Sequence, residues 1–157
     1  MDGVLMRISL STLKTSEVIG NYDPIRLYRD TEGYPLLNPM LLSLPSDELF
    51  VITNCSSEKS ADQKRRWLRH FYGDRLTLLP IFMATDKWGK DYVDPVARAK
   101  LDIIYKHKIE AYFDDDPAII RRMRDMHYDK IYEALRQDLP TQDIAFFKWG
   151  PWIEEWY

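Results

Sequence analysis

Short apolar runs alternate with helical patterns along the chain, and this alternation limits the possible folds more than any other feature. Helical spacing of apolar residues occupies most of the stretches between the runs. Strands that alternate with helices in this way are typical of a mainly parallel sheet flanked by helices. We therefore expect an α/β fold. The predicted strands are Val4–Leu10, Glu48–Thr53, Leu76–Met83, Ile109–Phe113 and Ile144–Lys148.

A capping residue followed by proline favours the start of a helix, and this pair precedes three of the predicted helices. These pairs are Asn38-Pro39, Asp94-Pro95 and Asp116-Pro117, and the helical stretches that follow them are 40–44, 96–105 and 118–126. A fourth stretch, Ser60–Tyr72, places Trp67, Leu68 and Phe71 on one apolar face. Its basic residues, including Lys64, are expected on a solvated face. Residues 11–37 are rich in turn formers and are predicted to be a loop or hairpin insert.

The chain has 157 residues, which fits a single domain spanning residues 1–157. Its formal charge of −3 argues against a broad basic surface for nucleic acid. Cys55 is the only cysteine, so an intrachain disulfide is excluded and a cytoplasmic location is expected. The sequence has no apolar run of about 18 residues, so no membrane span is expected. The first seven residues also lack the pattern of a signal peptide.

Acidic residues directly follow the fourth predicted strand. Asp116 is explained as a helix cap, which leaves Asp114 and Asp115 at the strand end. Ligands of parallel sheets bind beyond the carboxyl ends of the strands. Two adjacent carboxylates repel one another unless a cation lies between them, and hard oxygen ligands suit Mg²⁺. The pair therefore predicts a magnesium site, with a plain acidic turn as the equal alternative.

Two further groups have the chemistry of a phosphate site. Thr53 and Asn54 end the second strand with a hydroxyl and an amide that can hold phosphate oxygens, although both are also common turn formers. Lys100 is expected in the first turns of the helix that precedes the acidic strand end. Its ammonium could neutralise carboxylates and a phosphoryl group, or could simply face solvent. Lys106 and Lys108, at the far end of that helix, are alternative candidates for the same role.

The order of these groups resembles a known family. A hydroxyl at a strand end, then a helical lysine, then paired aspartates at a later strand end is similar to the second, third and fourth motifs of the haloacid-dehalogenase-like (HAD-like) phosphohydrolases. The resemblance covers residues 36–126 and is most evident in Lys100–Met123. It implies a three-layer αβα sandwich with a Rossmann-like sheet and Mg²⁺-dependent hydrolysis of phosphate esters. Receiver domains carry their acidic pair on the first strand, so the order excludes them.

The resemblance breaks at the first motif, a strand ending in Asp-x-Asp whose first aspartate attacks phosphorus. In one placement, Asp2–Leu5 is the tail of that motif and Asp2 is the general acid/base, so the attacking residue would precede it. In the other placement, the first predicted strand is the central one, and Ser9 or Ser11 replaces the nucleophile. No carboxylate occurs between Asp2 and Glu17. Neither placement supplies an attacking aspartate.

Three functions are therefore expected as alternatives. The first is a small HAD-like phosphohydrolase with an incomplete first motif. The resemblance implies that it has no large cap and takes large substrates such as a phosphorylated nucleic-acid end or a phosphoprotein, with a nucleotide as a further candidate ligand. The second is a pseudoenzyme of the same fold that binds or assembles. The third is a homo-oligomeric domain held through the aromatic segment Phe146–Tyr157, with folding of that segment back over the sheet as the alternative. The histidines, His70, His107 and His127, suggest neither a Ser-His pair nor a metal cluster.

Overall fold

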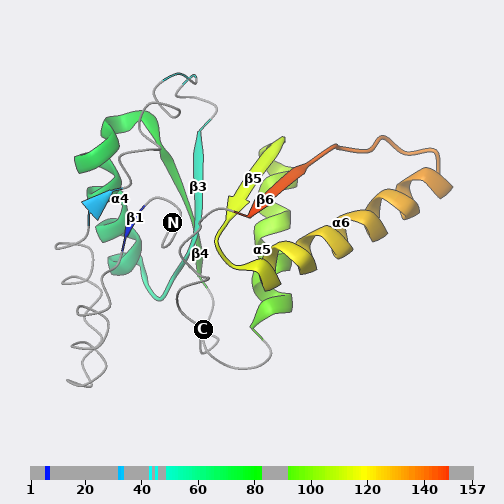
Figure 1. Cartoon of the computed structure of the whole chain (residues 1–157), viewed down its shortest axis with the longest axis horizontal. Coiled ribbons are helices and arrows are strands. Elements are labelled where there is room, and N and C mark those ends of the chain that lie inside the picture. Colours follow the sequence, from blue (N-terminus) through cyan, green and yellow to red (C-terminus); the bar gives the residue numbers. More distant parts are fainter. Residues whose placement is uncertain are drawn as a thin grey trace. The chain divides into compact units, whose positions relative to one another are not determined.

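The computed structural model describes residues 49–82 and 92–148, together with residues 6–7, 32–33, 43 and 45. The chain divides into two compact units, Met1–Met83 and Ala84–Tyr157. Each unit contains helices and one pair of parallel strands (Figure 1). These elements confirm the predicted α/β class. The single-domain organisation stays a prediction.

In the first unit, strand β3 (Phe50–Cys55) pairs in parallel with strand β4 (Thr77–Phe82), and helix α4 (Glu58–Tyr72) connects them through a 3₁₀ turn at Gly73–Arg75. The register runs from Phe50 opposite Thr77 to Cys55 opposite Phe82. Consecutive side chains of β3 are buried, which is typical of a strand in a parallel sheet. β3 also extends through Asn54 and Cys55, which were expected to follow the strand, because both lie opposite residues of β4.

Helix α4 corrects one prediction from the sequence. The Ser57 side chain caps its first turn by accepting a hydrogen bond from the Ser60 amide at 3.2 Å. Trp67 and Leu68 are buried as expected, whereas Phe71 of the same predicted face is exposed. Lys64 is buried too, because it precedes them by three and four residues and so lies on the same face. The expectation that Lys64 lies on the solvated face was wrong.

The second unit contains helix α5 (Val93–Lys106), strand β5 (Ala111–Asp114), helix α6 (Pro117–Arg136) and strand β6 (Ala145–Lys148). β5 and β6 are parallel, with Ala111 opposite Ala145 and Asp114 opposite Lys148. The core forms where α5 and α6 pack together and against alternate side chains of the strands. Its buried members are Val96, Ala97, Leu101, Ile104, Tyr112, Ile119, Ile120, Met123 and Phe146.

The two proline-marked helices of this unit begin in different ways. Asp116 is the cap of α6, as predicted, and its Oδ1 accepts hydrogen bonds from the amides of Ala118 and Ile119 at 2.8 and 3.3 Å. The prediction that Asp94 caps α5 was wrong, because the helix starts at Val93 and Asp94 lies inside its first turn. The Asp94 carboxylate instead accepts two hydrogen bonds from Arg122 of α6, at 2.6 and 2.8 Å.

The first part of the chain is described at only a few positions. Met6–Arg7 (β1) pairs antiparallel with Glu32–Gly33 (β2), so the described part of the first predicted strand pairs with the predicted insert rather than with a parallel neighbour. Ser43 is helical, whereas the rest of the predicted helix at 40–44 lies outside the described residues. Asp2, Ser9, Ser11 and residues 149–157 lie outside them as well.

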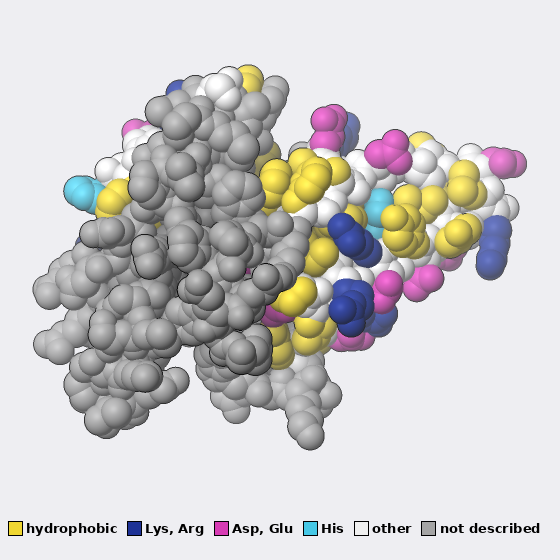
Figure 2. Space-filling view, in the orientation of Figure 1, with side chains coloured by type: hydrophobic (Ala, Val, Ile, Leu, Met, Phe, Trp, Pro, Cys, Tyr) yellow, Lys and Arg dark blue, Asp and Glu magenta, His cyan; other side chains and the backbone are white. Residues whose placement is uncertain are grey.

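Hydrophobic side chains reach the surface of the second unit, chiefly along α6 and the segment after it (Figure 2). Those of α6 and its C-terminal extension are Tyr128, Tyr132, Leu135 and Leu139. Among the residues that the structure describes, no helix is both long enough and apolar enough to cross a bilayer.

Candidate functional site

The acidic pair occupies the position that the sequence predicts. Asp114 is the last residue of β5, and Asp115 follows it before Asp116 caps α6. Asp114 is buried and Asp115 is half-buried. The short connection between strand and helix therefore presents both carboxylates at the carboxyl end of β5.

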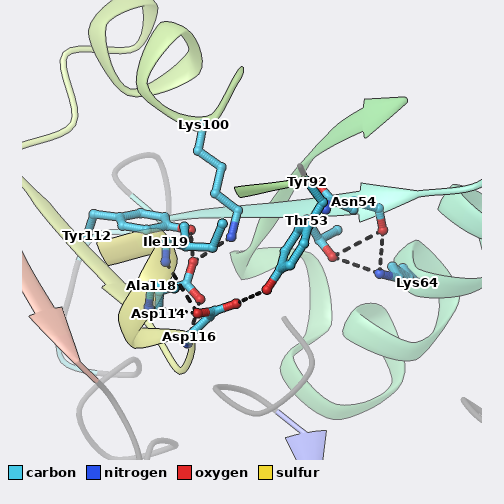
Figure 3. Close-up of polar contacts among 10 residues, drawn as sticks. All are labelled: Thr53, Asn54, Lys64, Tyr92, Lys100, Tyr112, Asp114, Asp116, Ala118 and Ile119. Carbon is cyan, nitrogen blue, oxygen red and sulfur yellow. Dashed lines mark hydrogen bonds and ion pairs between the residues drawn. The ribbon is translucent and has the colours of Figure 1, made fainter. Parts of the chain in front are cut away.

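Lys100 reaches this strand end from the middle of α5. Its side chain is nearly buried, and Nζ donates a hydrogen bond to Asp114 Oδ2 at 2.5 Å (Figure 3). The sequence placed Lys100 in the first turns of the helix, but α5 begins earlier than predicted, so the residue lies nearer the centre. The structure thus brings together two of the predicted site residues, Lys100 and Asp114.

Tyr112 belongs to the same cluster, although the sequence analysis did not single it out. It precedes Asp114 by two residues on β5, so both side chains point to the same face of the strand. Its hydroxyl donates to Asp114 Oδ2 at 2.5 Å, and the amide of Asp116 donates to Oδ1 at 3.1 Å. The alternation of the strand was the signal that could have identified Tyr112. Asp114 therefore receives three hydrogen bonds from the protein.

The two aspartates differ in their electrostatic environment. Burial raises the pKa of Asp114, but the Lys100 ammonium and the hydrogen bonds from Lys100 and Tyr112 outweigh burial and hold that pKa below its usual value. Burial and the adjacent Asp114 carboxylate raise the pKa of Asp115 to about 6. Burial and the same carboxylate raise the pKa of Tyr112 well above its usual value, so its phenol stays a donor. Near neutral pH the pair thus carries a firmly ionised Asp114 beside a weakly acidic Asp115.

A hydrogen bond also fixes the connection between β5 and α6. Tyr92 directly precedes α5. Its hydroxyl donates a hydrogen bond to Asp116 Oδ2 at 2.5 Å, and Oδ1 of the same carboxylate caps α6 (Figure 3). Both oxygens of Asp116 are therefore engaged with the protein. This leaves Asp114 and Asp115 as the carboxylates with remaining capacity for a ligand.

The donor set at this strand end fits a hard cation. Asp114 Oδ2 is occupied by two donors, but Oδ1 receives only one, so an oxygen lone pair remains. Burial and the Asp114 carboxylate raise the pKa of Asp115, and a bound cation would favour its charged form. Mg²⁺ needs only one or two carboxylates because it keeps several waters. Within the described residues, no group of three or more His, Cys, Asp or Glu side chains is arranged to hold a metal.

A second polar cluster lies in the first unit, at the end of β3. Lys64 of α4 donates to Thr53 Oγ1 at 2.7 Å and to the Asn54 carbonyl oxygen at 2.8 Å (Figure 3). Lys64 is 1 % exposed and Thr53 is 5 % exposed. The side-chain oxygen of Asn54 is buried and, among the described residues, has no hydrogen-bond partner. The predicted phosphate-binding pair, Thr53 and Asn54, is therefore joined by a lysine that the sequence analysis assigned to solvent.

A groove of about 1020 Å³ borders the start of β6, the C-terminal half of α6 and the segment that joins them. His127 lines it from α6, and its Nδ1 lies 2.5 Å from the Tyr105 hydroxyl oxygen. Burial lowers the pKa of His127, so the ring is neutral at physiological pH. Acidic and basic side chains both line the groove, including Lys130 and Glu133, so its charge selects no class of ligand.

Comparison of the chain with protein-family models, with characterised proteins and with solved structures finds no match. The functional interpretation therefore depends on the side-chain geometry of the two clusters and on the order of the motifs.

Proposed function

We propose that the chain is a HAD-like domain of the phosphohydrolase type that binds a phosphoryl group together with Mg²⁺, within a three-layer αβα sandwich whose sheet is Rossmann-like. The observation that carries this proposal is the buried ion pair of Lys100 with Asp114 at the carboxyl end of β5. A lone helical lysine normally faces solvent, whereas this one is held against the carboxylate that the motif order pairs with it. That pairing supports a shared role.

The residues divide between metal and phosphate by their chemistry. Asp115 and the remaining lone pair of Asp114 Oδ1 would hold Mg²⁺, which supplies charge to polarise a phosphoryl oxygen. Lys100 would contribute positive charge near a phosphoryl group at the end of β5. Within the first unit, Thr53 and Asn54 would offer hydrogen bonds to a phosphate oxygen. Phosphorylated ligands are the proposed partners, with a nucleotide or a nucleic-acid end as the proposed class.

Hydrolysis needs a further group that the first motif does not supply. Covalent catalysis of this type requires a carboxylate oxygen in line with phosphorus, and no carboxylate occurs between Asp2 and Glu17. Asp2 is the proposed acid/base, and it has no attacking partner in this sequence. The proposal is therefore binding of a phosphate and Mg²⁺ with negligible turnover of a generic phosphate ester.

A second candidate is a catalytically inactive binding or assembly module, and one observation favours it. Asp114 already accepts hydrogen bonds from Lys100, Tyr112 and the Asp116 amide. A carboxylate satisfied in this way can serve to fix α5 against β5 rather than to hold a metal. In that case the charge of Asp115 would have no function.

Calorimetric titration of Mg²⁺ into the full chain separates the two candidates. The variant Asp115→Asn removes the proposed metal ligand, and Asp102→Asn makes the same charge change at an exposed position of α5. We expect Asp115→Asn to abolish Mg²⁺ binding and Asp102→Asn to preserve it. Equal titration curves for the wild type and Asp115→Asn would favour the inactive module. Robust Mg²⁺-dependent hydrolysis of an aryl phosphate would instead mean that another carboxylate attacks phosphorus.

A further inference from the structure

Lys64 is a buried lysine for which the motifs provide no role. It projects from the buried face of α4 to the end of β3, where it contacts Thr53 and the Asn54 carbonyl (Figure 3). We propose that Lys64 is a positioning residue that makes the Thr53 hydroxyl a hydrogen-bond donor to an anionic oxygen. This inference rests on the proposed function, because the anion in question is the phosphate.

The direction of the hydrogen bonds supports this role. Lys64 Nζ donates to Thr53 Oγ1 at 2.7 Å, so the hydroxyl oxygen is the acceptor of this bond. The hydroxyl proton then points elsewhere. Its one described acceptor within reach is the Asn54 carbonyl oxygen at 3.5 Å, which is at the limit of a hydrogen bond and already accepts from Lys64. An incoming oxygen of better geometry would therefore receive the Thr53 proton.

The environment increases the strength of such a bond. Thr53 and Lys64 are both buried, and hydrogen bonds strengthen one another where the local dielectric is low. A hydroxyl oxygen that accepts a hydrogen bond becomes a stronger donor through its own proton. An anionic oxygen gains more from such a donor than a neutral one does, because charge-assisted hydrogen bonds are the stronger class. Lys64 therefore favours phosphate over an uncharged ligand at Thr53.

A purely structural role of Lys64 would have different consequences for its variants. If Lys64 only holds α4 against β3, its removal lowers stability and leaves the phosphate affinity of the folded protein unchanged. If it positions the Thr53 proton, Lys64→Met and Thr53→Val remove the same interaction by different routes. Each variant should then weaken phosphate binding, and the two together should be no worse than either one. Thr53→Ser keeps the hydroxyl and should retain the binding.

The experiment is calorimetric titration of inorganic phosphate into the full chain at saturating Mg²⁺. The variants are Lys64→Met, Thr53→Val, their combination and Thr53→Ser, with Lys59→Met as a control of equal charge change at an exposed position of α4. Loss of one hydrogen bond to a charged group should weaken binding roughly 10- to 100-fold. We expect that loss in Lys64→Met, in Thr53→Val and in the combination, but not in Thr53→Ser or Lys59→Met.

Three results would overturn the inference, and they are distinguishable. If the wild type binds phosphate and folded Lys64→Met binds it equally well, Lys64 has no positioning role and the proposed function stands. If the wild type binds no phosphate, the proposed function fails and the inference fails with it. Thr53→Val covers the case in which Lys64→Met does not fold, because it leaves the lysine in place. Unchanged affinity in Thr53→Val would also overturn the inference.

Discussion

At the scale of single residues, the candidate site depends on the different environments of two adjacent aspartates. The sequence predicts that Asp114 and Asp115 need positive charge between them, and in the structure Lys100 forms an ion pair with Asp114. Burial and the adjacent Asp114 carboxylate raise the pKa of Asp115 to about 6. The pairing of Lys100 could be anticipated from motif order. The alternation of β5 could have identified Tyr112, whereas the contacts of Lys64 depend on acceptors in β3 that are distant in the sequence.

The raised pKa of Asp115 has a consequence for stability. Because the folded state holds this proton more tightly than the unfolded state, ionisation costs stability as the pH rises from about 4 to above 6. Below about pH 4 the group is protonated in both states, and the cost disappears. We expect Asp115→Asn to be more stable than the wild type at pH 7, by roughly 1–3 kcal/mol after allowance for partial exposure.

Urea denaturation of both proteins at pH 4 and pH 7, without Mg²⁺, measures this difference. The stability difference should be small at pH 4 and should favour Asp115→Asn at pH 7. A difference of the same size at both pH values would mean that the pKa of Asp115 is not raised.

At the scale of elements, the helix starts show what a local pattern can and cannot predict. Asp-Pro pairs mark the beginnings of both α5 and α6, yet only Asp116 is a cap. Asp94 instead accepts a hydrogen bond from Arg122 of α6. Arg122 lies 28 residues further along the chain, so helical spacing within α5 does not predict this partner. Lys64 illustrates the same limit, because its burial depends on Thr53 and Asn54 of β3 as acceptors.

Substitution of the two aspartates should separate the cap from the surface pair. Asp116→Ala removes the hydrogen bonds to the first turn of α6 and the bond from Tyr92, and should cost about 1–2 kcal/mol of unfolding free energy. Asp94→Ala breaks an exposed ion pair and should change that free energy little. Thermal or urea unfolding of both variants provides the comparison. A loss in Asp94→Ala as large as that in Asp116→Ala would contradict this description of the two helix starts.

At the scale of the whole molecule, the alternation of strands and helices predicted the α/β class and the parallel pairing within each unit. The three-layer sandwich, the single domain and the HAD-like assignment stay predictions. Sequence spacing identifies which strands exist, but the order of strands in a sheet depends on packing between segments distant in the chain. The first motif illustrates the difficulty, because two placements fit its few residues and the described part, Met6–Arg7, pairs antiparallel.

The central claim is the proposal that the end of β5 binds Mg²⁺ and a phosphoryl group together, through Asp115 and Lys100. If so, binding of Mg²⁺ and of phosphate must be thermodynamically coupled, and the coupling must be equal in both directions. The most direct measurement is calorimetric titration of inorganic phosphate with and without saturating Mg²⁺, in the wild type and in Asp115→Asn. We expect Mg²⁺ to tighten phosphate binding at least fivefold in the wild type and to have no effect in the variant. Phosphate binding that is absent, or that is the same with and without Mg²⁺, would contradict the account.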